Sequence, residues 1–400
     1  MDFMAFFCSL TLLGLLIMPN VAEGATTAEL DKMIKVERVL DYVLDTAPIT
    51  DLDIEAALAY GNKAYDAWPG GCSCVAKQLD NGTMLLGRNM DFPLTERPVY
   101  IVRTNLKGMH PTIGLAYVTW DGPAYADALE RGIPKPFHDL LPFMSEDTMN
   151  DQGLYIETHV RISELSSTGE PLFASSGTNP TADLRLPAGA LPFYLAATCS
   201  TVEEAVPMAR SINLYSMQLG TNRYEFAWML ADSAGNYGVL EMAQNELSWL
   251  PQKQGHTNFY LTEKFAHKAQ FGYGQGRLDT LLHGRNAVKN KQDMLRLMNK
   301  VRYSQAYFPQ TAAFDVRSEY AGEKSDWTTD YVLQEKHRDE VMDEIRRESA
   351  DFQSYSIAER RARGGLFAQT IYTLTVDCNK REILAQFFED NTQQTTIGFR

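Results

Sequence analysis

The sequence predicts an α+β fold in which antiparallel strands predominate. Helix-like spacing of apolar residues is confined to the start of the chain and to a few later segments. From residue 75 onward, short β-rich runs flank turn residues in pairs, and two further runs lie near the C-terminus, at 370–376 and 382–388. With 400 residues, 44% of them hydrophobic and 22% charged, the chain can bury a large core.

The charge balance argues against two classes of partner. The chain has 37 Lys and Arg residues against 51 Asp and Glu residues, which gives a net charge of −14. An acidic surface repels phosphate groups, so we expect neither a nucleic acid nor an anionic membrane as a partner. The five cysteines include no CxxC pair and no Cys/His cluster with zinc spacing, so no metal is expected.

The first residues have the pattern of a signal peptide. An apolar run over residues 3–18 precedes a break at Pro19 and small residues at Ala22 and Gly24, the −3 and −1 positions that a signal peptidase accepts. The run is shorter than the ~20 residues that span a bilayer. We therefore expect residues 1–24 to be a signal peptide and the mature protein to be secreted, periplasmic or lysosome-like, with no stable membrane span. An uncleaved anchor is the alternative.

The segment that follows is expected to be helical. Apolar residues recur at three- and four-residue steps over residues 30–43, and a second such pattern runs from Ile54 to Tyr65. Pro48 separates the two patterns, and Trp68-Pro69-Gly70-Gly71 ends the second. Residues 25–71 therefore predict a helical pro-segment or small subunit ahead of the main domain, residues 72–400.

A β-hairpin is expected at the start of the main domain. The β-rich runs 75–79 and 84–86 enclose Asp80-Asn81-Gly82, and Asn-Gly favours the positive φ angles of a type I′ turn. Further strands are expected at 99–102, 112–119, 154–160, 226–230, 237–241 and 247–250, and helices from Thr201 and over 293–301. Residues 318–363 are dense in charge with a thin apolar stripe, which predicts a solvated helical insertion or, alternatively, a lid or partner-binding element.

One segment carries distinctive chemistry. Cys72 follows two glycines and opens a strand, and the hairpin returns Arg88 and Asp91 to the same end of the sheet. A cation beside the thiol favours the thiolate, and a carboxylate can hold an ammonium group. Cutting the Gly71–Cys72 bond would supply that ammonium as the Cys72 α-amine. An α-amine has a pKa of about 7.7–8.0 and a thiol one of about 8.5, so the amine can serve as base for its own thiol without a separate histidine.

These residues resemble a known family. The box Gly87-Arg88-Asn89-Met90-Asp91, whose arginine lies sixteen residues after Cys72, is similar to that of the choloylglycine hydrolase family. This family of N-terminal-nucleophile (Ntn) amide hydrolases includes bile salt hydrolase and penicillin V acylase. It is related to acid ceramidase, N-acylethanolamine acid amidase and isopenicillin N acyltransferase. Its members open their mature chain with Cys-Thr or Cys-Ser, as in Cys72-Ser73, and the spacing selects Cys72 over Cys74. The resemblance implies an αββα sandwich of two antiparallel sheets between helical layers.

Later segments match the family in order, and they imply further site residues. The matching segments are 149–154, 231–241, 256–259, 276–278 and 370–376. By resemblance, Asn150 and Asn258 would stabilise the oxyanion and Arg277 would polarise the leaving side of the amide. Asp91 would orient the α-amine of Cys72, and Arg88 would support its thiolate. No metal or organic cofactor is implied.

The resemblance implies an exported hydrolase that cuts itself at Gly71–Cys72. It would then cleave a linear, non-peptide C–N amide bond in a small-molecule acyl amide of the bile-salt, penicillin V or N-acyl type. The acyl group would lie on an apolar wall, for which the candidates are Phe92, Tyr100, Trp120 and Phe143.

Three other functions stay open at this point. They are an acyltransferase of the same fold, an uncleaved binding relative whose Cys72 nitrogen cannot act as a base, and a cysteine peptidase with a separate histidine. Each site residue also has a structural alternative. Cys72 can be a core thiol or half of a disulfide, and Cys74 a core thiol. Arg88 and Asp91 can be a hairpin ion pair and Asn150 a turn residue. Asn258 can be structural, with Glu263 as a rival, and Arg277 a surface cation.

Overall fold

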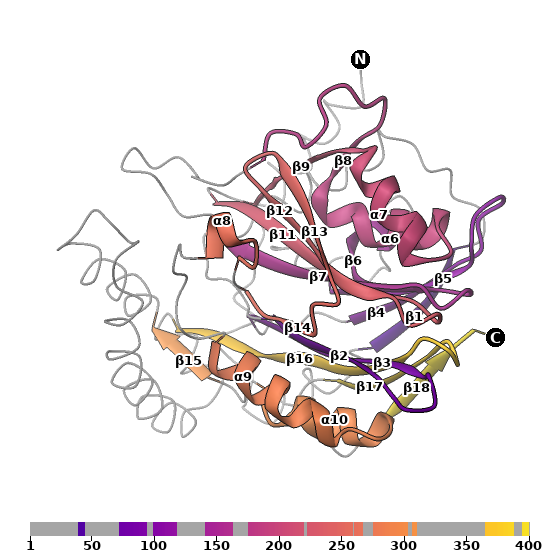
Figure 1. Ribbon diagram of the computed structural model, residues 1–400, viewed down its shortest axis with the longest axis vertical. Helices are drawn as coiled ribbons and strands as arrows, with labels where there is room; N and C mark the ends of the chain where they lie inside the picture. The colour runs from indigo at the N-terminus through magenta and orange to yellow at the C-terminus, as the bar shows by residue number, and fades with distance from the viewer. Residues whose placement is uncertain are drawn as a thin grey trace, which may run out of the picture.

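Two β-sheets form the centre of the protein in the computed structural model (Figure 1). The structure describes residues 39–44, 72–93, 99–117, 141–162, 175–219, 222–258, 260–266, 275–302, 306–309, 365–387 and 394–399.

The first sheet has nine strands among the described residues. Its order is β1 (Val39–Leu44), β4 (Val99–Thr104), β5 (Thr112–Tyr117), β6 (Ser145–Asn150), β7 (Tyr155–Ile162), β11 (Asn222–Ala231), β12 (Tyr237–Ala243) and β13 (Glu246–Pro251), with β10 (Met217–Leu219) beside β11. Every neighbouring pair is antiparallel except β1 and β4, which are parallel.

The second sheet has seven described strands, all paired antiparallel. Its order is β14 (Gly255–His256), β2 (Cys72–Gln78), β3 (Met84–Pro93), β16 (Gly365–Asp377), β17 (Glu382–Phe387) and β18 (Thr395–Gly398), with β15 (Ala306–Pro309) beside β16.

Helices cover the outer face of each sheet. α6 (Leu191–Thr198) and α7 (Val202–Arg210) lie on the first sheet, whereas α9 (Gln275–Gly284) and α10 (Lys291–Asn299) lie on the second (Figure 1). The remaining described elements are short: α8 (Glu263–Ala266), the 3₁₀ turns η2 (Leu141–Met144), η3 (Ala188–Ala190) and η4 (Arg285–Ala287), and the parallel pair β8 (Arg185–Pro187) and β9 (Asn213–Tyr215). The layers run helix, sheet, sheet, helix, which is the αββα sandwich that the sequence resemblance implied.

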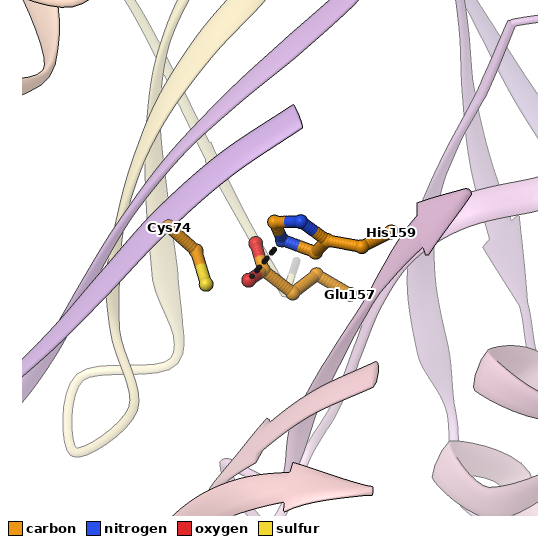
Figure 2. A group of neighbouring side chains, drawn as sticks. All are labelled: Cys74, Glu157 and His159. Atoms are coloured by element: carbon orange, nitrogen blue, oxygen red, sulfur yellow. Dashed lines mark hydrogen bonds and ion pairs between the residues drawn. The ribbon is translucent and has the colours of Figure 1, made fainter. Parts of the chain in front are cut away.

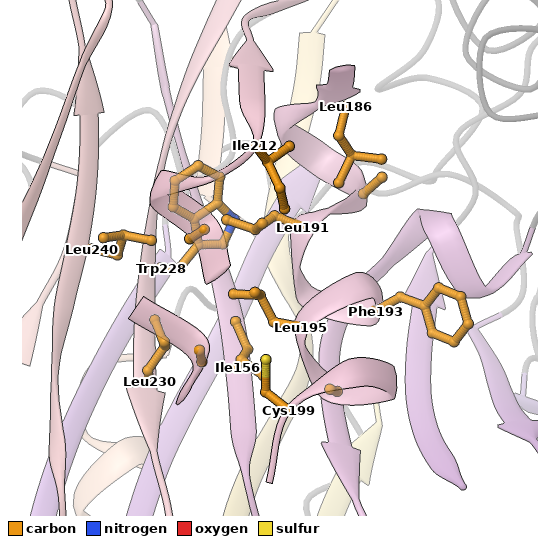
Figure 3. Packing of buried hydrophobic residues seen from close by; sticks show 14 of the residues in the cluster. Ile156, Leu186, Leu191, Phe193, Leu195, Cys199, Ile212, Trp228, Leu230 and Leu240 are labelled. Carbon is orange, nitrogen blue, oxygen red and sulfur yellow. The ribbon is translucent and has the colours of Figure 1, made fainter. Parts of the chain in front are cut away.

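Alternation along the strands separates three cores. On β11, Trp228 and Leu230 point to α6 and α7 (Figure 3), whereas Ala227 and Met229 point to the second sheet. Val75 of β2 and its neighbours on β3 pack against α10 in a third core. Because a strand in the middle of this stack is covered on both faces, nearly all its side chains are buried, polar ones included.

Two local expectations differ from the structure. Residues 39–44, expected to be helical, form β1 and pair with β4 over six residues. The β-branched and aromatic residues of this segment favour a strand once an open sheet edge is available. The hairpin turn is not type I′ either, because Gly82 has a φ of +83° whereas Asn81 does not have positive φ. Gly82 N donates to Leu79 O, as in a type I turn closed by a left-handed glycine.

Several predictions fall outside the described residues. These are the signal peptide at 1–24, the rest of the 25–71 segment, Gly71 and the insertion at 318–363. Within the described part of the chain, none of the helices has the length and apolarity that a bilayer span requires. The four cysteines of the described residues, at 72, 74, 199 and 378, are buried and not disulfide-bonded.

Candidate active site

Strand pairing places Asn258 beside Cys72. β14 pairs antiparallel with β2, with His256 opposite Cys74, so two residues further on the same register puts Asn258 opposite Cys72. The Cys72 backbone N donates a 2.7 Å hydrogen bond to Asn258 Oδ1. Asn258 Nδ2 donates at 2.8 Å to the carbonyl oxygen of Val160 on β7, which fixes the amide orientation.

Arg88 lies beside the Cys72 thiol and is held by an acidic residue of the first sheet, Asp147. Its side chain is wholly buried, and its Nε donates to Asp147 Oδ1 at 2.8 Å. Tyr155 and Tyr372 also donate their hydroxyls to Asp147. Burial lowers the pKa of Arg88, but the negative charges around it, that of Asp147 foremost, together outweigh burial and hold the pKa above its usual range, so the guanidinium stays charged. No sequence pattern indicates Asp147, because its partner Arg88 lies 59 residues away and on another sheet.

The groups around the Cys72 thiol shift its pKa in opposite directions. Burial raises the pKa of Cys72, and Arg88 opposes this both by its charge and by a hydrogen bond to the sulfur. Asp91 and Glu146 raise it further by charge repulsion of the thiolate. The resting thiol is therefore protonated, and a base is needed to activate it.

A second ionic group lies at the same end of the sheet, on the side of α9. Arg277 Nη1 of α9 donates to Asp91 Oδ2 at 2.7 Å, and its Nη2 lies 3.3 Å from Asn258 Oδ1. Thr370 donates to the other Asp91 oxygen. Burial raises the pKa of Asp91 to about 6, while Arg277 and Thr370 oppose the shift. The structure thus brings five of the predicted residues together: Cys72, Arg88, Asp91, Asn258 and Arg277.

The sixth predicted residue, Asn150, does not lie with them. On β6, Asp147 and Met149 face the second sheet, so Asn150 faces α6 instead. Its Nδ2 donates both protons, to Ala196 O at 2.9 Å and to Cys199 O at 2.6 Å. In this arrangement Asn150 Nδ2 has no proton left for an oxyanion. The turn-forming alternative fits Asn150, because its Oδ1 accepts from two backbone N–H groups beyond it.

The proposed apolar wall is also not assembled as expected. Phe143 packs edge-on against Phe193 of α6, with ring centroids 4.9 Å apart, in the core on the far face of the first sheet. Tyr100 alternates with the inward-facing Val99 and Ile101, so it points away from the second sheet. Trp120 and the side chain of Phe92 lie outside the described residues.

A buried polar cluster beside Arg88 was not anticipated. Cys74 of β2 faces Glu157 and His159 of β7 between the two sheets (Figure 2), and all three are buried. Their ligand atoms lie within 4.8 Å of one another, a Cys/Glu/His set of the kind that can hold a zinc ion. Two polar residues spaced by two in a buried strand were the signal in the sequence.

Taken together, fold and site define an αββα sandwich in which a cysteine opens strand β2 of the second sheet within reach of two arginines, an aspartate and an asparagine. Similar solved structures include a mutant of conjugated bile acid hydrolase from Clostridium perfringens, with 14% identity over 82% of this chain and 92% of that one and a TM-score of 0.46. Penicillin V acylase from Agrobacterium tumefaciens has 12% identity over 82% and 86% and a TM-score of 0.44.

These two enzymes are of the kinds that the sequence resemblance named. No family model matches the sequence, and no curated protein matches it.

Proposed function

We propose that this protein is an Ntn cysteine hydrolase that cleaves a linear amide C–N bond after cutting its own chain at Gly71–Cys72. The observation that carries the proposal is the environment of one residue. The Cys72 nitrogen donates to Asn258 Oδ1, and the Cys72 sulfur hydrogen-bonds to the Arg88 guanidinium. The charge of Asp91 raises the pKa of the thiol. Residues of β3 and the distant Asn258 thus converge on both reactive atoms of a single cysteine.

Self-cleavage frees the base that the buried thiol lacks. Cys72 Sγ attacks the Gly71 carbonyl carbon, and the thiol proton passes to the departing Cys72 nitrogen as the C–N bond breaks. The acyl group thereby moves from nitrogen to sulfur as a thioester. Water then hydrolyses this thioester, leaving a carboxylate on Gly71 and a free amine and thiol on Cys72. With a pKa of about 7.7–8.0, that amine can accept the thiol proton near neutral pH.

The same atoms then process the substrate. The amine takes the thiol proton, the thiolate attacks the amide carbonyl, and the amine returns the proton to the leaving nitrogen. Asn258 keeps one Nδ2 proton that is not used by Val160, and this proton can meet the oxyanion. Asp91 holds the ammonium form, Arg88 supports the thiolate, and Arg277 fixes both Asp91 and Asn258. Water releases the acyl group from sulfur.

The substrate class follows from the resemblance, and the expected compartment follows from the N-terminal pattern. We propose an acyl amide of the bile-salt, penicillin V or N-acyl type, in a secreted, periplasmic or lysosome-like compartment. A peptidase that uses Cys74 with His159 as its base is disfavoured. Burial and Glu157 raise the pKa of this thiol, and burial lowers the pKa of His159, which makes its imidazole a weak base.

Intact mass under denaturing conditions tests the proposal, with a matched pair of cysteine variants. The wild type should give two pieces, the larger beginning at Cys72, and should hydrolyse at least one of taurocholate, penicillin V and an N-acyl ethanolamide. Cys72→Ala should remain one chain without turnover, whereas Cys74→Ala should cleave and turn over. A single unbroken wild-type chain would support the binding alternative, and turnover by Cys72→Ala would exclude Cys72 as the nucleophile. Product that forms only with an added amine would indicate an acyltransferase.

A further inference from the structure

The buried cluster of Figure 2 has a hydrogen-bond pattern that the proposed reaction does not use. His159 Nδ1 lies 3.2 Å from the backbone carbonyl oxygen of Thr257, and its Nε2 lies 3.1 Å from Glu157 Oε1. Neither side chain is exposed to solvent. Thr257 directly precedes Asn258, so the imidazole is connected to the residue that holds the Cys72 nitrogen.

The chemistry of the acceptors fixes the proton positions. A carbonyl oxygen only accepts, so His159 Nδ1 must carry the proton that it donates to Thr257. In a neutral imidazole, Nε2 is then an acceptor, and the proton between it and Oε1 must belong to a protonated Glu157. The alternative is a buried ion pair of an imidazolium and a carboxylate.

The electrostatic environment favours the neutral pair. Burial, the neighbouring His256 and Arg88 lower the pKa of His159 well below its usual range. Burial raises the pKa of Glu157 to about 8, a shift that Asp147 adds to and Arg88 opposes. At pH 7 the imidazole is therefore uncharged and the carboxyl is mostly protonated.

We propose that Glu157 and His159 form a neutral acid–imidazole dyad that positions Asn258 against the nitrogen of Cys72. The acid fixes the imidazole tautomer, the imidazole fixes the Thr257 carbonyl, and the peptide thereby sets the approach of the Asn258 side chain. Both are positioning residues. Their effect on turnover rests on the proposed function, whereas the tautomer itself does not.

The dyad predicts a response to alkaline pH. The charged and titratable groups that face Glu157 are Arg88 of β3, whose Nε is 3.4 Å from Oε2, Asp147 of β6, Cys74 of β2 and His159 on its own strand; His256 of β14 acts on His159. Above about pH 8 Glu157 loses its proton and can no longer donate to Nε2. The tautomer with the proton on Nε2 would then turn a lone pair toward the Thr257 carbonyl, which is unfavourable.

The tautomer is measured directly by ¹⁵N NMR of histidine-labelled full-length protein, with His159 assigned by comparison with His159→Gln. At pH 7 we expect a proton on Nδ1 and none on Nε2. A proton on Nε2 alone, or an imidazolium with both, overturns the dyad. So does one equivalent of zinc that is lost in Cys74→Ser, because Oε1 and Nε2 would then be metal ligands. The tautomer can be measured even if the wild-type chain never cleaves itself. Absence of cleavage would contradict the proposed function but not the dyad.

Two Glu157 variants test the positioning. Glu157→Gln keeps a donor for Nε2 and the shape of the side chain, so its cleavage rate and kcat should stay within about threefold of wild type. Glu157→Leu should lose roughly 10²-fold in kcat with little change in KM. The ratio of Glu157→Gln to wild-type kcat should rise above about pH 8. If Glu157→Gln is as impaired as Glu157→Leu, or if its ratio to wild type is flat with pH, Glu157 does not act as a donor. If Glu157→Leu fails to fold, the pH dependence of the ratio of Glu157→Gln kcat to wild-type kcat still tests whether Glu157 acts as a donor.

Discussion

Asn150 and Asn258 carry the same side chain, but the strand face on which each lies decides what its amide can do. Both are satisfied by backbone groups, yet only Asn258 has Cys72 among its partners. The sequence context of Asn150, next to Gly153, favours an active-site loop and a tight turn equally. The alternation of side chains along β6 distinguishes the two roles, because it turns Asn150 toward α6. β6 was not among the predicted strands.

The two asparagines therefore predict opposite phenotypes. Asn258→Ala should lower kcat by about 10²-fold, because a donor to the oxyanion and the partner of the Cys72 nitrogen are lost together. Asn150→Ala should leave kcat unchanged and lower the free energy of unfolding by about 2 kcal/mol, since buried backbone groups lose their partners. Kinetics and urea denaturation of both variants measure this. A catalytic defect in Asn150→Ala at full stability would contradict the assignment.

The pKa of Asp91 predicts an acid limit to activity. Its ionised form pairs with Arg277, and with a pKa of about 6 that form is lost as the pH falls through this value. In the cleaved enzyme the positive charge of the Cys72 α-ammonium would lower this pKa. We therefore expect kcat/KM to fall below a midpoint at or under about pH 6. The same upward shift means that the folded state binds more protons than the unfolded one, so this group lowers stability as the pH rises from about 4 to 6. Asp91→Asn should be slow and independent of pH over this range, and a wild-type profile without an acid limb would refute the role.

At the scale of elements, the first hairpin followed from local signals, although its turn type did not, and long-range pairing did not either. Most predicted strands are present, including β2, β3, β11 and β16. β1 was expected to be helical because its apolar residues satisfy both periodicities, and only the free edge of β4 decides between them. Arg88 and Cys72 were placed correctly because one hairpin connects them, while Asp147 and Glu157 come from a separate sheet.

Two glycines with nearly equal backbone angles predict different costs of substitution. Gly82 and Gly153 have φ of +83° and +85°. A Cβ at Gly82 meets nothing within 4 Å, whereas at Gly153 it would lie 2.2 Å from the Cys378 carbonyl oxygen. Gly82→Ala should cost about 1 kcal/mol for the left-handed conformation alone, and Gly153→Ala about 3 kcal/mol or more. Thermal and urea unfolding of both variants would show the difference, and equal costs would mean that the turn shifts without strain.

At the scale of the whole molecule, the proposed cleavage separates two pieces that remain joined by backbone hydrogen bonds. β1 lies before Cys72 in sequence and pairs with β4 over six residues. We therefore expect the upstream piece to stay bound after the cut. Under native size exclusion the two pieces should elute together, and they should separate only on denaturation. Elution of the upstream piece by itself would show that this pairing does not survive cleavage.

The position of β1 at the border of its sheet also has a consequence for production of the protein. A chain started directly at Cys72 would have the ready-made amine but would leave the N–H and C=O groups of β4 along Val99–Thr104 without their neighbour. An unpaired edge strand of this kind can form β-sheet hydrogen bonds with strands of further copies of the chain. Preparations made without the upstream residues should accordingly self-associate, and supplying a synthetic peptide that spans Val39–Leu44 should suppress it.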